Sequence, residues 1–109
     1  MTDPLLRGVT AAANEEGQPR DARAQHVAQI VHDRCGYRWV GIYDVADDES
    51  TLLAQAGQGP DGDRLSIPIL GAESGIAIGT LDVVGSAALT KDDERFLDDC
   101  AAAAIALFE

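Results

Sequence analysis

One carboxylate stands in an otherwise apolar stretch near the end of the chain. Asp82 lies within GTLDVV, residues 79–84, and the burial of an unpaired carboxylate costs free energy. Two roles are therefore open for Asp82. In the first, it accepts hydrogen bonds from loop amides or pairs with Arg38 or Arg64. In the second, it anchors a ligand, and its neighbours in the site are Thr80, Trp39 and Tyr43.

Large aromatic side chains are concentrated in another short stretch, YRWVGIYDV, residues 37–45. This stretch holds the only Trp and both Tyr residues of the chain. The alternation of side chains along a strand places Trp39 and Tyr43 on the same side. These two rings either line a site that binds a small molecule or fill a core.

No catalytic or metal-binding pattern accompanies these residues. Residues 57–62, GQGPDG, fit G-x-G-x-x-G, but a strand-like segment follows where the dinucleotide fingerprint requires a helix, so we interpret them as a turn. His26 and His32 are six residues apart, so they do not share a helix face as zinc ligands at i and i+4 would. We expect no catalytic residue, no metal and no cofactor.

The overall composition is that of one acidic domain. The chain has 109 residues and a formal net charge of −11, from 8 Lys and Arg against 19 Asp and Glu. Such a surface repels phosphate backbones and anionic lipids, so we expect no nucleic-acid and no membrane partner.

Cys35 and Cys100 both fall in helical patterns and are expected to be buried thiols rather than a disulfide. A cytoplasmic protein is the expectation, because a secretory signal pattern is also absent.

The elements that must position these residues follow from periodicity and from start and stop signals. A first helix starts at Asp3 and Pro4 and closes at residues 14–17, and a second runs from Pro19 to Cys35, where Gly36 is a stop signal. Four strands are expected over residues 39–45, 51–57, 65–70 and 75–84, with residues 47–50 in the first turn. Thr90 caps a last helix whose apolar stripe reaches Phe108. Pro68 cannot donate to a ladder, which favours an edge position or a bulge for its strand.

The order is therefore α-α-β-β-β-β-α, and the predicted fold class is α+β, an antiparallel sheet with helices from both chain ends. The blocks that carry a resemblance are WVGIYDV, LLAQAGQG, SIPIL, GIAIGTLDVVGS and LTKDDERFLDDCAAAAIALF. In this order and spacing, over roughly residues 19–109, they resemble the GAF domain family. The resemblance implies one GAF-like domain over residues 1–109, with the helix in residues 1–17 at its periphery. It also implies terminal helices on one face of the sheet and a small-molecule pocket under a lid on the other.

Within that family, WVG-x-Y followed by GTLDV is most similar to the free methionine-(R)-sulfoxide reductases. The resemblance implies that Trp39 and Tyr43 match pocket aromatics and that Asp82 matches a pocket carboxylate. The chain departs from the pattern at other positions: Val84 stands where the group has a second acid, and Arg64 where it has a Glu. The segment that carries the redox cysteines of the group is reduced here to residues 58–64, which contain no cysteine.

A lid is also missing, because seven residues, 58–64, span at most about 25 Å and cannot cover a sheet face. Four apolar residues are expected to face the helices: Val40, Ile42, Leu81 and Val83. The uncovered side is expected to carry Trp39, Tyr43, Ile78, Thr80 and Asp82. This leaves a semi-exposed apolar surface with two large aromatics, and such surfaces usually mark an interface or a groove.

We therefore expect a minimal GAF-like binding or interaction module of the signalling type, without catalytic activity. Its expected partner is a second copy of the chain, which would bury the aromatic face or the Ala-rich terminal helix. Two alternatives stay open. The first is a small-molecule sensor pocket formed by Trp39, Tyr43, Thr80 and Asp82, and the second is a degenerate free methionine-(R)-sulfoxide reductase.

Overall fold

A computed structural model describes residues 4–46, 49–59, 62, 64–71, 75–85 and 89–108. The elements are α1 (Pro4–Ala13), α2 (Arg20–Cys35), β1 (Trp39–Ala46), β2 (Glu49–Gly57), β3 (Arg64–Leu70), β4 (Ala77–Val84), α3 (Lys91–Ala103) and the 3-10 turn η1 (Ile105–Leu107). The strands form one antiparallel sheet in the order β2-β1-β4-β3. The predicted α+β class and element order are confirmed. The expected cap at Asp3 lies outside the described residues, as do Asp47 and Asp48 of the expected turn. Glu49 and Ser50, expected in the same turn, belong instead to β2, where they pair with Ala46 and Val45 of β1.

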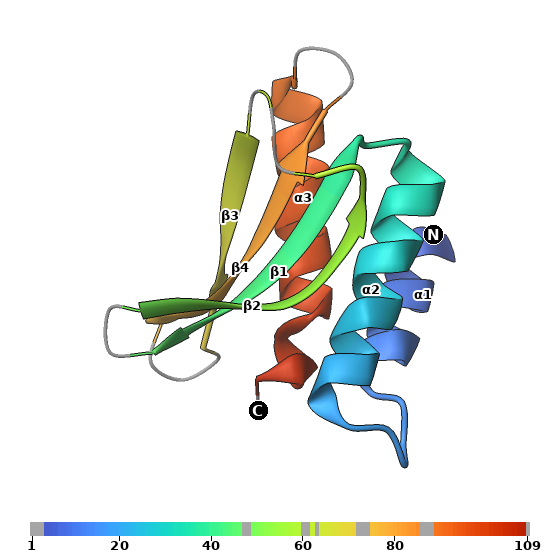
Figure 1. The fold of residues 1–109 in the computed structure, drawn as a ribbon, viewed down its shortest axis with the longest axis vertical. Coiled ribbons are helices and arrows are strands. Elements are labelled where there is room, and N and C mark those ends of the chain that lie inside the picture. The colour runs from blue at the N-terminus through green and yellow to red at the C-terminus, as the bar shows by residue number, and fades with distance from the viewer. Residues whose placement is uncertain are drawn as a thin grey trace.

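The helices gather on one face of the sheet (Figure 1). α2 packs on β1 and β2, α3 packs on β3 and β4, and α1 lies against α2 and α3. The alternation of the strands sends Val40, Ile42, Leu81 and Val83 into this layer, where all four are fully buried. α1 adds Val9, Ala12 and Ala13 to the same core. The predicted helix-facing set is confirmed, and burial of these apolar side chains is the main source of stability.

Local signals define the ends of two helices. Gly36 ends α2 with a φ of 71°, and its N–H donates to the His32 carbonyl, 3.1 Å away, as in the left-handed C-terminal cap that favours glycine. At the start of α3, the Thr90 hydroxyl accepts from the Asp93 N–H and the Asp93 carboxylate accepts from the Thr90 N–H. This reciprocal pair is a capping box, and it confirms the cap predicted at Thr90. The Thr90 bonds hold the pKa of Asp93 below its usual value.

The last helix departs from the expectation of one apolar stripe that runs to Phe108. The α-helix ends at Ala103, and the chain tightens into η1 before Phe108. The Phe108 ring lies against Gly79 of β4, where a Cβ would come within 2.5 Å of Phe108 Cζ. The tighter turn brings this ring onto the sheet, so the chain packs Phe108 against Gly79 instead of continuing the α-helix.

Tyr37 ties the start of β1 to the start of α3. The phenol is buried and donates to Asp93 Oδ1 at 3.2 Å. Burial first, and then the Asp93 carboxylate, raise the pKa of Tyr37 well above its usual value. Cys35, half-buried at the end of α2, and Cys100, buried in α3, belong to the same helical layer. No helix in the described part of the chain is long and apolar enough to cross a membrane.

β3 lies at one edge of the sheet, which confirms the edge position expected from Pro68. β2 lies at the other edge and ends at Gly57, whose φ is 106°. A Cβ at Gly57 would lie 2.2 Å from the carbonyl oxygen of Arg38 and 2.9 Å from Trp39 Cα. Glycine is therefore required here for two reasons, the positive φ and the close approach of the β1 backbone.

The substitution Gly57→Ala should lower the free energy of unfolding by about 3 kcal/mol or more, because backbone strain and a backbone clash act together. Gly59→Ala is the matched control, since Gly59 has a φ of 128° but no atom within 4 Å of its added Cβ. We expect a loss of about 1 kcal/mol there, from backbone strain alone. Urea unfolding followed by circular dichroism measures both values, and equal losses would contradict the close approach of β1.

Candidate functional site

The face of the sheet opposite the helices, here called the open face, carries the predicted site residues. Strand register arranges this face in three rows. The first row is Gly57, Trp39, Val84 and Arg64, the second is Gln55, Gly41, Asp82 and Ser66, and the third is Leu52, Tyr43, Thr80 and Pro68. All four predicted site residues therefore share one face, distributed over β1 and β4.

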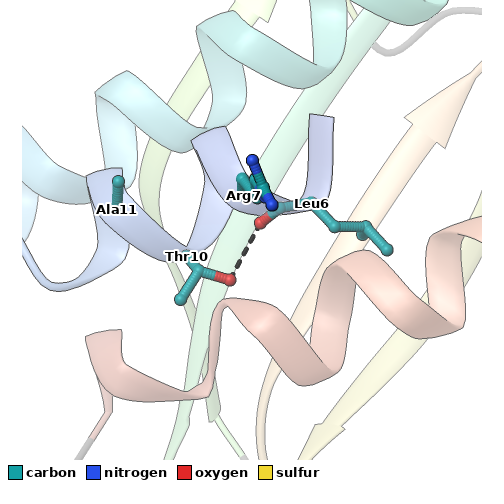
Figure 2. Close-up of a pocket in the computed structure, with 4 residues that line it drawn as sticks. All are labelled: Leu6, Arg7, Thr10 and Ala11. Carbon is teal, nitrogen blue, oxygen red and sulfur yellow. Dashed lines mark hydrogen bonds between the residues drawn. The ribbon is translucent and has the colours of Figure 1, made fainter. Parts of the chain in front are cut away.

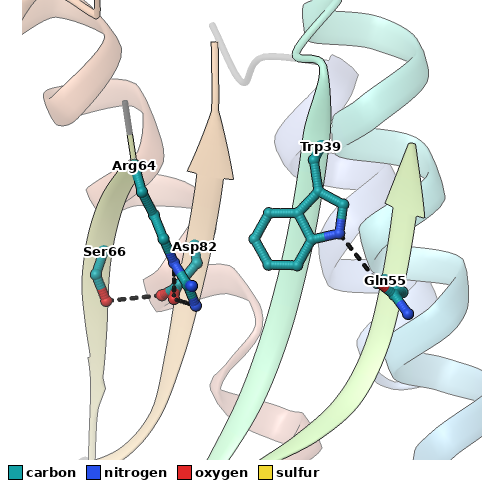
Figure 3. Close-up of polar contacts among 5 residues, drawn as sticks. All are labelled: Trp39, Gln55, Arg64, Ser66 and Asp82. Atoms are coloured by element: carbon teal, nitrogen blue, oxygen red, sulfur yellow. Dashed lines mark hydrogen bonds and ion pairs between the residues drawn. The ribbon is translucent and has the colours of Figure 1, made fainter. Parts of the chain in front are cut away.

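The Asp82 carboxylate is the centre of a polar cluster on this face (Figure 3). Asp82 Oδ2 accepts from Arg64 Nε at 2.8 Å and also from Arg64 Nη2, and Oδ1 accepts from Ser66 Oγ at 2.7 Å. Only 5% of the Asp82 side chain is exposed, against 39% of Arg64. The hydrogen bonds to Asp82 are the largest effect that raises the pKa of Arg64. The sequence left loop amides, Arg38 and Arg64 as possible partners of Asp82, and the structure pairs Asp82 with Arg64.

The chain itself covers Trp39. Its exposed fraction is 1%, its Nε1 donates to Gln55 Oε1 at 3.0 Å, and the guanidinium of Arg64 lies 5.2 Å from the ring centroid. The indole lies over Gly41, where a Cβ would fall 2.3 Å from Trp39 Cη2. The prediction of a semi-exposed Trp39 is therefore wrong. The missing side chain at Gly41 lets the ring lie flat on the sheet, and the Arg64 side chain covers it.

Tyr43 and Thr80 are half-buried and lie opposite each other in the third row. The Arg64 guanidinium is 5.2 Å from the Tyr43 ring centroid as well, so it contacts both rings of the predicted site. A cation over the face of an aromatic ring is held by the ring quadrupole. The two rings and Asp82 thus hold one guanidinium in place, with part of it open to solvent.

Three residues of this cluster were not among the predicted site residues. The sequence marked Arg64 as a possible partner of Asp82 and as a departure from the reductase pattern, and it gave no role to Ser66 or Gln55. The alternation Arg64-x-Ser66 places both side chains on one face of β3, which is a signal that sequence alone contains. The register that sets Ser66 against Asp82, and Gln55 against Gly41, comes from strand pairing and could not be deduced from any single strand.

The chemistry available at the open face is recognition by charge, hydrogen bonds and ring contacts. The two cysteines lie on helices, in the layer across the sheet from Asp82. Among the described residues, no group of three or more His, Cys, Asp and Glu side chains is arranged to hold a metal ion. The cluster therefore consists of charged, hydroxyl, amide and aromatic groups, and neither cysteine thiol belongs to it.

Two further depressions lie away from the open face. One, of about 370 Å³, is an apolar groove on α1 lined by Leu6, Arg7, Thr10 and Ala11, in which the Thr10 hydroxyl donates to the Leu6 carbonyl (Figure 2). The other, of about 230 Å³, lies between β3 and α3. Its lining residues are Pro68, Leu70, Asp98, Ala101, Ala102 and Ile105.

Several solved structures superimpose on nearly the whole of this chain. The free methionine-R-sulfoxide reductase from Neisseria meningitidis, solved in complex with its substrate, superimposes with a TM-score of 0.76 at 18% identity, over 99% of this chain and 92% of that chain. The GAF domain from the Acinetobacter phosphoenolpyruvate-protein phosphotransferase gives 0.72 at 13% identity, over 98% and 93% of the two chains. The protein has the GAF-like fold.

A third similar structure of this fold is the GAF domain of a putative sensor histidine kinase from Pseudomonas syringae pv. tomato. It has a TM-score of 0.60 at 16% identity, over 90% of this chain and 83% of that chain. No protein-family model matches the sequence of this GAF-like domain, and no curated protein matches it in sequence. The likeness therefore concerns the fold, and it confirms the fold that the sequence blocks imply.

Gly41→Ala should displace the indole of Trp39, because the new Cβ would occupy the space of the ring. We expect a red shift of the fluorescence emission and a loss of about 1–3 kcal/mol in the free energy of unfolding. Trp39 is the only Trp of the chain, so the emission reports on this side chain alone.

Gly8→Ala in α1 is the control, since its added Cβ meets only Ile30 side-chain atoms at 3.8 Å, an ordinary contact. Alanine is a better helix former than glycine, so this variant should be at least as stable as the parent and its emission should not change. An unchanged emission in Gly41→Ala would contradict the position of the indole over Gly41.

Proposed function

We propose that this chain is a non-catalytic GAF-like binding module that takes a small molecule at the open face. The observation that carries the proposal is the buried Asp82 carboxylate, held by Arg64 and Ser66 and flanked by Trp39 and Tyr43 on a face that no helix covers. The proposed ligand-contacting residues are Trp39, Tyr43, Thr80 and Asp82, as predicted from the sequence, together with Arg64.

The energetics of the cluster support a binding role over a purely structural one. A buried ion pair is often no more stabilising than well-packed apolar residues of the same volume, and β4 is otherwise built from apolar residues and Thr80. Convergent polar groups beside aromatic rings are typical of sites that bind small molecules. Free methionine-R-sulfoxide reductases of this fold, from Neisseria meningitidis and Staphylococcus aureus, have been solved with their substrates, which supports a small molecule as the ligand class.

The position of the thiols argues for binding without turnover. Reduction of a sulfoxide by a thiol needs a thiolate within reach of the substrate, but Cys35 and Cys100 lie on α2 and α3, across the sheet from Asp82. Residues 58–64, which lead into the site, contain no cysteine.

A signalling role is part of the proposal and is supported by the fold shared with the GAF domain of a sensor histidine kinase. A cytoplasmic location completes it. The chain has 2 cysteines, too few for the disulfide framework on which small secreted domains depend.

The absence of turnover is tested with free methionine sulfoxide and a thiol reductant. We expect no reduction above the rate of the reductant alone, for the parent protein and for Cys35→Ser and Cys100→Ser alike, because neither sulfur can reach the open face. Reduction that is abolished by one of these substitutions would contradict the proposal and favour a degenerate reductase.

Self-association is a second candidate function, and the groove between β3 and α3 favours it. Leu70 is 49% exposed at the end of the edge strand, next to the exposed Ala102 and the half-buried Ile105. Pro68 lacks the N–H that strand-to-strand pairing along this edge would require. We therefore propose that a homodimer would pack through the Ala-rich end of α3 rather than extend the sheet, and that Trp39 takes no part in it.

Leu70→Asp should shift the parent dimer to a monomer in sedimentation velocity runs, because a charge would be buried in the apolar contact. Leu52→Asp makes the same change at an exposed Leu of β2, the opposite edge strand, and should leave the dimer intact. A parent protein that stays monomeric at high concentration would rule out this second function without affecting the ligand site.

A further inference from the structure

The charge that solvent meets at the open face is the guanidinium of Arg64. Asp82 lies beneath it with 5% of its side chain exposed, whereas 39% of the Arg64 side chain is exposed. An approaching ligand therefore reaches the cation of the pair before it reaches the carboxylate. Arg64 is thus the more exposed member of the ion pair in the structure as it stands.

The carboxylate has little capacity left for a ligand. Oδ2 accepts from both Nε and Nη2 of Arg64, and Oδ1 accepts from Ser66 Oγ. An ammonium ligand could reach Asp82 only by displacing Arg64, which would leave two cations competing for one carboxylate. A cationic ligand is thus opposed by the chain's own guanidinium.

The guanidinium, in contrast, keeps donors for a further acceptor. Arginine has five N–H donors in a planar fork that suits carboxylates. The two bonds to Asp82 use two of them, and a hydrogen bond to Tyr43 uses a third. The Trp39 and Tyr43 rings, each 5.2 Å from the guanidinium carbon, hold the group in one place. A cation that is already positioned loses little side-chain freedom on binding, which favours affinity.

The side chains and the net charge around Arg64 limit the kind of anion that can bind there. The formal net charge of the chain is −11, and a polyanion would be repelled by this surface much more strongly than a single carboxylate. The row next to Asp82 carries Leu52, which is exposed, Tyr43, Thr80 and Pro68. These side chains provide apolar area and two hydroxyls, those of Tyr43 and Thr80, beside the guanidinium.

We infer that the ligand of the open face is a small monocarboxylate with an apolar body. Its carboxylate accepts hydrogen bonds from Arg64, and its apolar part lies over Tyr43 and Leu52. Asp82 and Ser66 are then positioning residues that hold the guanidinium from behind. This inference rests on the proposed binding function and adds to it the sign of the ligand charge.

Three compounds of equal chain length test the sign of that charge: hexanoate, hexanamide and hexylammonium. Binding is followed by the emission of Trp39 and by the NMR signal of the Arg64 Nε–H, a readout that a merely structural role of Arg64 would not move. Hexanoate should bind at least about tenfold more tightly than the other two, the effect of roughly one charge-assisted hydrogen bond. Its affinity should fall as salt is added.

The variants separate the role of Arg64 from its effect on folding. Arg64→Gln combined with Asp82→Asn removes the cation without leaving a buried carboxylate unpaired, and it should abolish the preference for hexanoate. Arg64→Lys keeps the charge but loses the fork, so it should weaken the binding of hexanoate while the preference remains. Arg95→Gln removes an exposed cation from α3, on the other side of the sheet, and should change nothing.

Tighter binding of hexylammonium than of hexanoate would overturn the inference and leave the proposed binding function standing. Equal binding of hexanoate by the parent and by the Arg64→Gln, Asp82→Asn variant would overturn it as well. If none of the three compounds, nor methionine sulfoxide, perturbs either signal in the folded parent protein, the proposed function fails together with the inference.

Discussion

The burial of one carboxylate in the middle of a sheet is the constraint on which the open face depends. Asp82 would be strongly destabilising on β4 without partners, and the pairing of β3 with β4 supplies them from Arg64 and Ser66. The Arg64 side chain must cross the face to reach Asp82, and in doing so it covers Trp39 and contacts Tyr43. Gly41 is part of the same arrangement, because the indole occupies the space of its missing side chain. One electrostatic requirement thus organises residues from three strands, and Gln55 on the fourth completes the arrangement by accepting from the indole.

The two faces of the sheet are stabilised by different kinds of interaction. The face towards the helices is apolar and closely packed, with Val40, Ile42, Leu81 and Val83 fully buried. The open face satisfies a buried charge with hydrogen bonds and ring contacts. This division places both cysteines in the helical layer and the paired Asp82 and Arg64 on the other face. The chain retains the fold of sulfoxide reductases and of GAF domains, but it presents a guanidinium, not a thiolate, at that face.

Arg64 also explains why a short connection is sufficient in this chain. Residues 58–64 cannot form a lid across the sheet, yet Trp39 is almost completely buried. A Cβ at Gly62 would lie 3.2 Å from Val84 Cγ1, so Gly62 lies against the first row. The long side chain of Arg64 also covers the Trp39 ring, because its aliphatic part and planar head can shield a ring while the charge stays partly hydrated. The aromatic pair therefore does not require a second protein to cover it.

The sequence by itself predicted the helices, the strands, their order and the side of the sheet that the named residues of β1 and β4 face. Those properties follow from local signals: the alternation in residues 39–45, the left-handed stop at Gly36, the capping box at Thr90 and the Pro68 that marks an edge strand. It also singled out Asp82 and its two candidate roles. Only the tertiary structure decided between Arg38 and Arg64 as the partner, brought Ser66 and Gln55 into the cluster and buried Trp39. The physical reason is that register and long side-chain reach join residues from different strands, and no local pattern encodes such a pairing.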